Sequence, residues 1–357
     1  MRVEVIRGKE LDDRLAAEWS AIQRSDPELG NPFLCPQFTR IVASIRRGVF
    51  VAVLEEAGRI VGFFPFQRRL PGSGRPVGAP LSDYQAVIIL PGVSWDAKDL
   101  LRQCGLRRWT FDHLGGAQPP LEPYRSYSDR YLFLDLSAGY PAYVSARRAA
   151  GTEQIKKVAG LARKLEREAG TIRFRAREVD REALRELFRW KSEQYVRSGL
   201  IDAFRFRWII RFFRRLMESH DEDFAGMLST LSVGGRLIAA QFGLRSRRSW
   251  HYWIPAYDRE FARFSPGNIL LLKMAEAAPD LGIERITLGY DDADYKRRFA
   301  SGSRPMAAGR VELPPSLTSL EKKVEKVLRS AIVSLPIPAR RVADERLDRL
   351  KIWWKFH

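Results

Sequence analysis

An internal repeat constrains the fold of this chain more than any other feature of its sequence. Residues 51–64 read VAVLEEAGRIVGFF, and residues 228–241 read LSTLSVGGRLIAAQ. Each stretch predicts an apolar strand, a turn that contains glycine and a second apolar strand, because glycine adopts the positive φ that tight hairpin turns require. The sequence therefore predicts two related hairpins, one in each half.

The elements after each hairpin repeat in the same order, as strand, helix and strand. In the first half these are residues 84–90, 96–104 and 109–114, and in the second half residues 250–254, 267–281 and 285–289. Two matches in one order indicate duplication of a single α/β unit. The fold class expected is therefore α/β, built as a tandem duplication.

The 357-residue length suits two domains. We expect an N-terminal domain at residues 1–138, a C-terminal domain at 139–313 and a basic helical tail at 314–357. A basic helical segment over residues 140–169, ending at Gly170, joins the two halves. The tail is interpreted as a helical hairpin docked on the second domain, or alternatively as a segment that binds a membrane surface or a partner protein.

Composition limits the functional classes and the compartment. Two cysteines and four scattered histidines give neither a disulfide framework nor the spacing of a metal site. No apolar run approaches the ~18 residues of a membrane-spanning helix, and the N-terminus lacks a secretory signal, so a cytoplasmic protein is expected. The net charge of +18 fits an anionic substrate, or alternatively a nucleic-acid or membrane partner.

The stretch from Ala256 to Leu271 predicts the end of a strand, a tight turn at residues 265–267 and the start of an apolar helix. The first backbone N–H groups of a helix have no partners within the helix, so such a turn is suited to binding an anion. Pro266 supplies no N–H there, and a plain helix start is the alternative interpretation.

This order of strand, glycine turn, helix and strand resembles the GNAT acetyltransferase fold. The chain resembles the acetyltransferases associated with bacterial cellulose synthesis, which are related to the Fem-type double-GNAT transferases. The resemblance implies tandem GNAT-like domains, acetyl-CoA or another acyl-CoA as cosubstrate, and no permanently bound cofactor. It implies that the pyrophosphate is bound by Arg263, Ser265, Gly267 and Asn268, with Lys296 as a further binding residue.

An acidic loop supplies the candidate catalytic groups. Asp291, Asp292 and Asp294 lie close together in the sequence, and neighbouring carboxylates raise one another's pKa toward the range of a general base. Tyr295, picked out by the resemblance, is expected to protonate the departing thiolate. The alternative interpretation is a solvated acidic loop that caps the next helix.

Two groups of residues are predicted to bind the acceptor. Gln241, Tyr252 and Asp258 lie on or beside strands that flank the expected cleft of the second domain. The first domain contributes Asp83, Tyr84 and Gln85 within a segment that also resembles the family. Its own helix lacks a comparable glycine turn, so we expect the first domain not to bind CoA and to form one wall of the acceptor site.

The leading hypothesis is an acyltransferase that moves an acyl group from acyl-CoA to an amine or hydroxyl of a sugar-like or amino-acid-like acceptor, in exopolysaccharide or cellulose production. The first alternative is a Fem-like transferase that uses aminoacyl-tRNA, the one reading in which nucleic acid is a partner. The second is a non-catalytic scaffold of a membrane synthase complex, held at the inner membrane through the basic tail.

Overall fold

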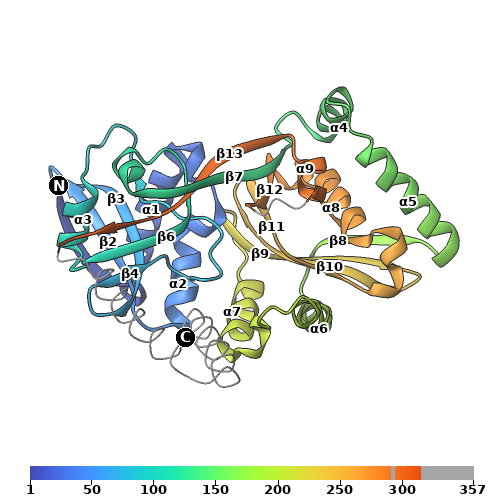
Figure 1. Cartoon of the computed structure of the whole chain (residues 1–357), viewed down its shortest axis with the longest axis horizontal. Coiled ribbons are helices and arrows are strands. Elements are labelled where there is room, and N and C mark those ends of the chain that lie inside the picture. The colour runs from blue at the N-terminus through green and yellow to red at the C-terminus, as the bar shows by residue number, and fades with distance from the viewer. Residues whose placement is uncertain (291–293, 315–357) are drawn as a thin grey trace, which may run out of the picture.

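The computed structural model describes residues 1–290 and 294–314. Asp291, Asp292 and the expected tail after residue 314 lie outside the described residues. The predicted α/β class with a duplicated unit is confirmed, and both units contribute to one continuous sheet (Figure 1).

The first unit begins with a strand and two helices before its hairpin. Its elements are β1 (Arg2–Arg7), α1 (Asp13–Ser25), α2 (Pro36–Ile45), β2 (Val49–Glu56), β3 (Arg59–Leu70), β4 (Ser73–Arg75), β5 (Ile88–Ile89), α3 (Ala97–Gln103), β6 (Arg108–Gly115) and β7 (Arg125–Asp135).

The second unit repeats this order after two connecting helices, α4 (Tyr140–Ala149) and α5 (Gln154–Ala169). Its elements are β8 (Ile172–Glu178), α6 (Arg181–Arg197), α7 (Arg207–Glu218), β9 (Phe224–Val233), β10 (Arg236–Ser246), β11 (Ser249–Tyr257), α8 (Pro266–Ala277), β12 (Arg285–Gly289), α9 (Asp294–Phe299) and β13 (Gly302–Glu312).

The strand order of the sheet is symmetric about its centre. It runs β1-β2-β3-β4-β6-β13-β7-β12-β11-β10-β9-β8, and β5 pairs with β3 beside this path. Every neighbouring pair along it is antiparallel except β4 with β6 and β11 with β12, which occupy equivalent places in the two halves. The duplication predicted from the sequence is therefore present in the strand order and in the strand directions.

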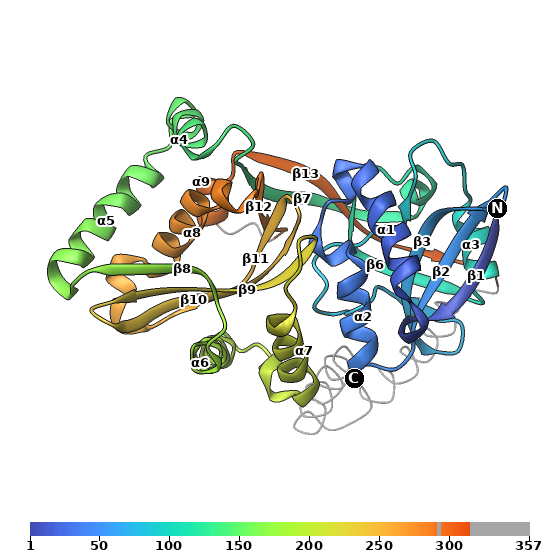
Figure 2. The same ribbon diagram turned by 180° about the vertical axis from the view of Figure 1, so that it is seen from behind.

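The last strands of the two units are exchanged across the centre of the sheet. β7 follows β6 in the chain but pairs with β12, and β13 follows β12 but pairs with β6. β7 and β13 also pair with each other, so both extend across the junction between the halves (Figure 1, Figure 2). Each half of the sheet is thus completed by a strand from the other half of the sequence.

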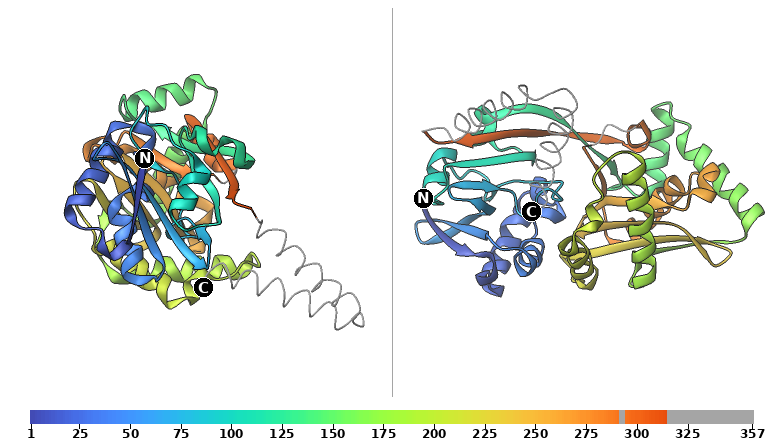
Figure 3. Two further views of the ribbon diagram at one scale, coloured as in Figure 1. Left: turned by 90° about the vertical axis from the view of Figure 1, so that its left-hand side faces the viewer. Right: turned by 60° about the horizontal axis from the view of Figure 1, so that its bottom comes forward.

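The helices cover the sheet on both faces. On one face α1, α2, α6 and α7 share a core that runs across both halves, and Phe38 of α2 packs edge-on against Phe212 of α7, with ring centroids 5.8 Å apart. On the other face α5 and α8 pack on the second half, whereas α3 packs on the first half. Figure 3 shows the two halves side by side with this common helical layer.

Two expected elements differ in the structure. The expected strand over residues 84–90 is reduced to β5 and an isolated bridge at Gln85, because residues 76–87 leave the strand path as a loop. The single helix expected over residues 140–169 is two helices, α4 and α5. The expected stop at Gly170 is confirmed, since Gly170 has a φ of 100° and caps α5.

No helix in the described residues is both long and apolar enough to cross a bilayer.

Candidate active site at the junction of the two halves

The second half of the sheet contains a fork between two parallel strands. β11 pairs with β12 only from Ser249 to His251, opposite residues 285–287. Beyond this point β11 continues to Tyr257, paired with β10 on its other side, while β12 ends at Gly289. Within the part of the chain that the structure describes, the backbone edge of β11 that faces β12 therefore has no strand partner after His251.

The predicted turn lies immediately after β11. Ser265 has the left-handed conformation (φ 52°, ψ 55°), and Pro266 is the first residue of the 12-residue helix α8. Asn268 donates its backbone N–H to the carbonyl of Ser265 at 2.9 Å. Among residues 1–290 and 294–314, a Cβ atom at Gly267 would meet only Tyr257 at 3.7 Å and the Tyr252 hydroxyl at 4.0 Å, which are ordinary contact distances. The surface at Gly267 therefore has room for a bound group.

Tyr252 and Tyr295 lie behind this turn. Tyr252 is buried, and its hydroxyl donates to the Gly267 carbonyl at 3.5 Å. Burial raises the pKa of Tyr252, and the nearby Tyr295 raises it further. Arg263 does not face the turn: its guanidinium pairs with Glu168 of α5 at 3.0 Å and is well exposed.

The equivalent fork in the first half is filled by the chain itself. β4 pairs with β6 at only two positions, and Gln85 then occupies the gap. Gln85 accepts a backbone bond from Gly115 and donates one to His113, both within 2.9 Å. Its side-chain oxygen also accepts from the N–H groups of Asp112 and His113, at 3.1 and 3.2 Å. The first half therefore has no open strand edge at this position.

The loop that closes the first fork also brings Asp83 to the second half. The Asp83 carboxylate lies 3.2 Å from Nε2 of His251, a residue at the base of the second fork. The Asp83 side chain is 26% exposed, whereas the His251 side chain is 1% exposed. Asp83 thus connects a buried histidine with solvent at the junction of the two units.

The contacts of His251 are those of a neutral ring with its proton on Nε2. Nδ1 lies 2.9 Å from the Thr287 hydroxyl and 3.1 Å from the Tyr131 hydroxyl, which itself accepts from Asn31 at 3.0 Å. Burial lowers the pKa of His251, although Asp83 acts in the opposite direction. A neutral ring that donates from Nε2 to Asp83 and accepts at Nδ1 satisfies these contacts.

Lys296 completes a set of three groups around the end of β12. A methyl group added at Gly289 would lie 3.8 Å from Cε1 of His251, 3.9 Å from Nζ of Lys296 and 4.0 Å from Oδ2 of Asp83. Gly289 has a φ of +79°, a conformation that favours glycine, so this point is kept open by the backbone. A carboxylate, a neutral imidazole and an ammonium group therefore surround one open point at the fork.

The other predicted acceptor residues have different surroundings. Gln241 is fully buried within the sheet and donates to Ser229 at 3.1 Å. Tyr84 is buried beside the junction and donates to the Glu28 carbonyl at 3.3 Å. Asp258 caps the turn after β11 and pairs with Arg236 at 2.6 Å. Each of these side chains makes at least one bond to the protein, whereas the buried Oε1 of Gln241 has no partner among the described residues. The predicted role of the three residues in acceptor binding stays a prediction.

Of the acidic loop, the described part is Asp294. It begins α9 and forms an ion pair with Arg297, which lowers the pKa of its carboxyl group. The upward shift expected from the neighbouring carboxylates is therefore wrong for Asp294, because Arg297 on the next turn of the helix dominates.

Sequence reasoning missed His251 and His113. His113 lies 3.0 Å from Asp112 and stacks edge-on with Tyr290, with ring centroids 4.4 Å apart. The available signal for His251 was one ionisable residue within the apolar strand Trp250-His-Tyr-Trp-Ile. That signal is weak by itself, because its partners Asp83 and Tyr131 lie more than 100 positions away in the chain.

Comparison with known proteins agrees with this geometry. Residues 152–297 match the model of the acetyltransferase (GNAT) domain. Residues 152–297 therefore form a GNAT domain. This matched region contains the fork, α8 and the first four residues of α9, but neither β7 nor β13. No curated protein matches the sequence at a significant level.

Similar solved structures extend over nearly the whole chain. FemX is 10% identical, with a TM-score of 0.60 over 91% of this chain and 99% of FemX. The C-terminal domain of a putative lysylphosphatidylglycerol synthetase from Agrobacterium fabrum is 11% identical, with a TM-score of 0.53 over 85% of this chain and 96% of that domain. A tandem GNAT protein from the clavulanic acid pathway is 13% identical, with a TM-score of 0.48 over 88% of this chain and 100% of that protein. The first two likenesses show a shared fold.

Proposed function

We propose that this protein transfers an acyl group from acyl-CoA to an amine or hydroxyl of a small acceptor at the junction of its two halves. The observation that carries the proposal is the open fork between β11 and β12, followed directly by the turn into α8, within a region that matches the GNAT domain. The second half would bind CoA, and the first half would contribute Asp83 and no CoA site.

In this proposal the pantetheine chain of CoA pairs with the unpaired edge of β11. The pyrophosphate binds at residues 265–268, at the N-terminal end of α8, where Gly267 leaves room for it. The thioester carbonyl then comes near the open point at Gly289, beside Lys296. Lys296 binds CoA there, and its positive charge also favours the negative charge that develops on the carbonyl oxygen.

Asp83 is the group that we assign to the acceptor. The acceptor nitrogen or oxygen attacks the thioester carbon, the C–S bond breaks, and the acceptor's proton passes to the Asp83 carboxylate. The neutral His251 donates to Asp83 from behind and fixes its position. Tyr295, behind the turn, supplies a proton to the departing thiolate. Asp291 and Asp292 precede Tyr295 in the sequence, and their catalytic roles stay predictions.

The proposal also names the chemical class of the acceptor. We propose a sugar-like or amino-acid-like acceptor, since a partly exposed carboxylate beside a histidine suits hydroxyl and amine groups. A role in exopolysaccharide or cellulose production, a cytoplasmic location and contact of the tail with the inner membrane are proposed with it, on the resemblance of residues 30–310 to that family.

Calorimetric titration with acetyl-CoA of two variants at Gly267 tests the proposed CoA site. Gly267→Ala adds only a methyl group at ordinary contact distances, so it should bind acetyl-CoA like the unmodified protein. Gly267→Trp should fill the turn and reduce the affinity at least ~100-fold while the protein stays folded. Equal affinity in both variants would contradict the site.

One observation favours a second candidate, a Fem-like transferase that uses aminoacyl-tRNA. The fold is shared with FemX, and α5 presents an exposed basic face that includes Lys156, Lys157 and Arg163. A ligand that binds only the folded state raises the melting temperature. Under the leading proposal acetyl-CoA raises it and tRNA does not, and the reverse result would favour the second candidate.

A further inference from the structure

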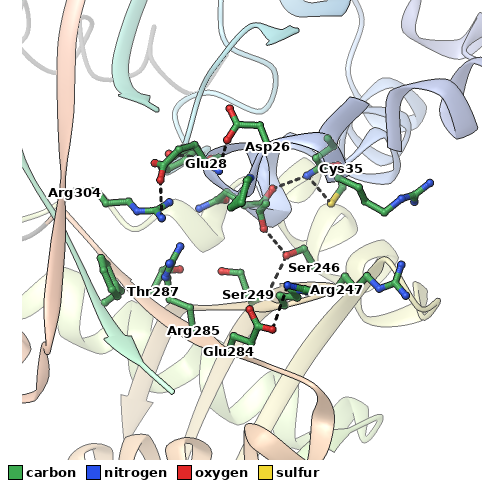
Figure 4. Close-up of a pocket in the computed structure, with 18 of the residues that line it drawn as sticks. Asp26, Glu28, Cys35, Ser246, Arg247, Ser249, Glu284, Arg285, Thr287 and Arg304 are labelled. Carbon is green, nitrogen blue, oxygen red and sulfur yellow. Dashed lines mark hydrogen bonds and ion pairs between the residues drawn. The ribbon is translucent and has the colours of Figure 1, made fainter. Parts of the chain in front are cut away.

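A cavity lies at the junction of the two halves, apart from the fork. Its volume is about 320 Å³, at the small end of the range for small-molecule sites. Its walls come from residues 26–31 of the first unit, the strands β7 and β12, and the turn between β10 and β11 (Figure 4). The cavity is therefore built by both halves of the chain.

A layer of buried side chains separates this cavity from Asp83. Asn31, Tyr131 and Thr287 line the cavity and are each less than 10% exposed. The Tyr131 and Thr287 hydroxyls contact Nδ1 of His251, whereas Asp83 contacts Nε2 on the other side of the ring. A ligand in the cavity would thus lie on the opposite side of His251 from the proposed reaction.

Five arginines line the cavity, and four of them are neutralised by carboxylates. The pairs are Arg24 with Asp223 at 3.0 Å, Arg247 with Glu222 at 3.2 Å, Arg248 with Glu284 at 3.3 Å and Arg304 with Glu28 at 2.6 Å.

Arg285 differs from these four. Within residues 1–290 and 294–314 it has no carboxylate within ion-pairing distance, and its buried Nε has no hydrogen-bond partner. Its guanidinium lies over the Phe133 ring at 4.6 Å. Burial lowers its pKa, and the neighbouring Arg304 lowers it further. Glu28 and Asp135 act on it in the opposite direction, without forming an ion pair with it. The cavity therefore contains one partly desolvated cation without an ion pair among the described residues.

Glu28 and Asp135 are the carboxylates that act on Arg285, and Asp135 lies opposite it on β7. Glu28 pairs with Arg304, and Asp135 accepts from the Ser137 hydroxyl at 2.6 Å and from its N–H at 3.1 Å. These negative groups disfavour a dianion such as phosphate more than a ligand with one negative charge, and a single carboxylate can accept two hydrogen bonds from the Arg285 guanidinium. The rings of Tyr84, Tyr131 and Phe133 offer apolar contact to the rest of a ligand.

We propose that this cavity binds a small organic monocarboxylate with an apolar body, and that Arg285 receives its carboxylate. This site lies apart from the proposed CoA position and from Asp83, although Tyr84, one of the predicted acceptor residues, lines it. The inference does not depend on the CoA site.

Titration calorimetry with 3-phenylpropanoate as the probe, and the neutral 3-phenylpropanamide as its control, tests this site. The carboxylate should bind the unmodified protein, and the amide should bind at least ~10-fold more weakly, because it lacks the charge-assisted hydrogen bonds. Arg285→Met should lower the affinity for the carboxylate at least ~10-fold. Arg248→Met removes an already paired arginine of the same cavity and should change the affinity less than ~3-fold.

The melting temperature and far-ultraviolet circular dichroism of each variant show whether it is folded, independently of any CoA site. The inference is overturned if the folded protein shows no binding of the carboxylate at millimolar concentration. It is also overturned if the amide binds equally well, or if Arg285→Met binds the carboxylate as tightly as Arg248→Met does.

Discussion

At the scale of single residues, the contact between Asp83 and His251 connects the two units at the proposed active site. Asp83 could be predicted as a site residue because its sequence context resembles the family. His251 could not be predicted as a site residue, because a single histidine in an apolar strand does not reveal partners that lie far away in the chain. The contact between them depends on a loop that closes the first fork, which strand and helix periodicity does not reveal.

Replacement of Asp83 by asparagine tests its role as proton acceptor. Asp83→Asn keeps the size of the side chain but removes the base, so the turnover rate should fall ~10²–10⁴-fold. The affinity for acetyl-CoA should change little, because the proposed CoA contacts lie in the second half. Steady-state rates with an established acceptor and calorimetry with acetyl-CoA measure the two effects. Retention of more than a tenth of the turnover would remove Asp83 from the mechanism.

The pKa values of the two buried histidines are shifted in opposite directions, which predicts opposite effects of pH on the free energy of unfolding. Burial lowers the pKa of His251, so below pH 6.5 the unfolded chain binds a proton that the folded chain does not. The stability that His251 contributes is therefore lost as the pH falls from about 6.5 through the folded-state pKa. For His113, burial acts to lower the pKa, but Asp112 outweighs it and the net shift is upward. The contribution of His113 is therefore lost as the pH rises above about 6.5.

Chemical denaturation between pH 4.5 and 8.5 measures these contributions. His251→Asn should flatten the dependence of the unfolding free energy on pH on the acid side of 6.5. His113→Asn should flatten it on the alkaline side. Parallel pH profiles for both variants and the unmodified protein would show that neither histidine has a shifted pKa.

At the scale of elements, the two forks explain why only one half is proposed to bind CoA. The hairpins, the turn at residues 265–267 and the start of α8 could be predicted from glycine positions and apolar patterns, because these features are local. The loop over residues 76–87 could not, since its apolar residues 86–89 have the pattern of a strand. Its conformation depends on the bonds of Gln85 to β6, which no local pattern encodes.

Removal of the Gln85 side chain tests the closed state of the first fork. Gln85→Ala leaves the buried N–H groups of Asp112 and His113 without their side-chain acceptor, so the unfolding free energy should fall by about 1–3 kcal/mol. Urea denaturation measures this change. Gln194→Ala, at an exposed position on α6, is the matched control and should stay within about 0.5 kcal/mol. An equal effect of both substitutions would contradict the structural role of Gln85.

At the scale of the whole molecule, the exchange of β7 and β13 ties the two units together. The duplication was visible in the sequence, but the exchange was not. Both arrangements, with and without exchange, place the same strands in the same order within each unit. The choice between them depends on contacts between strands about 150–200 positions apart in the chain, such as Tyr131 with Arg304.

Fragments of the chain test the importance of this exchange. A fragment of residues 139–314 lacks β7, so the edge of β12 is left unpaired and an apolar surface is exposed. A fragment of residues 125–314 retains β7. We expect the shorter fragment to aggregate or to be digested rapidly by protease, and the longer one to be more soluble and more resistant. Equal solubility and protease resistance would show that β7 contributes little to the second half. The boundary proposed at residues 138/139 would then describe an independent domain.

The central claim is that acyl-CoA binds at the fork of the second half and not at the closed fork of the first. A crystal structure of the protein with CoA tests it most directly. The account predicts pantetheine along the edge of β11 beyond His251, the pyrophosphate at residues 265–268, and the sulfur near Gly289, Lys296 and Asp83. CoA between β4 and β6, or at any position that leaves the turn into α8 unoccupied, would contradict it.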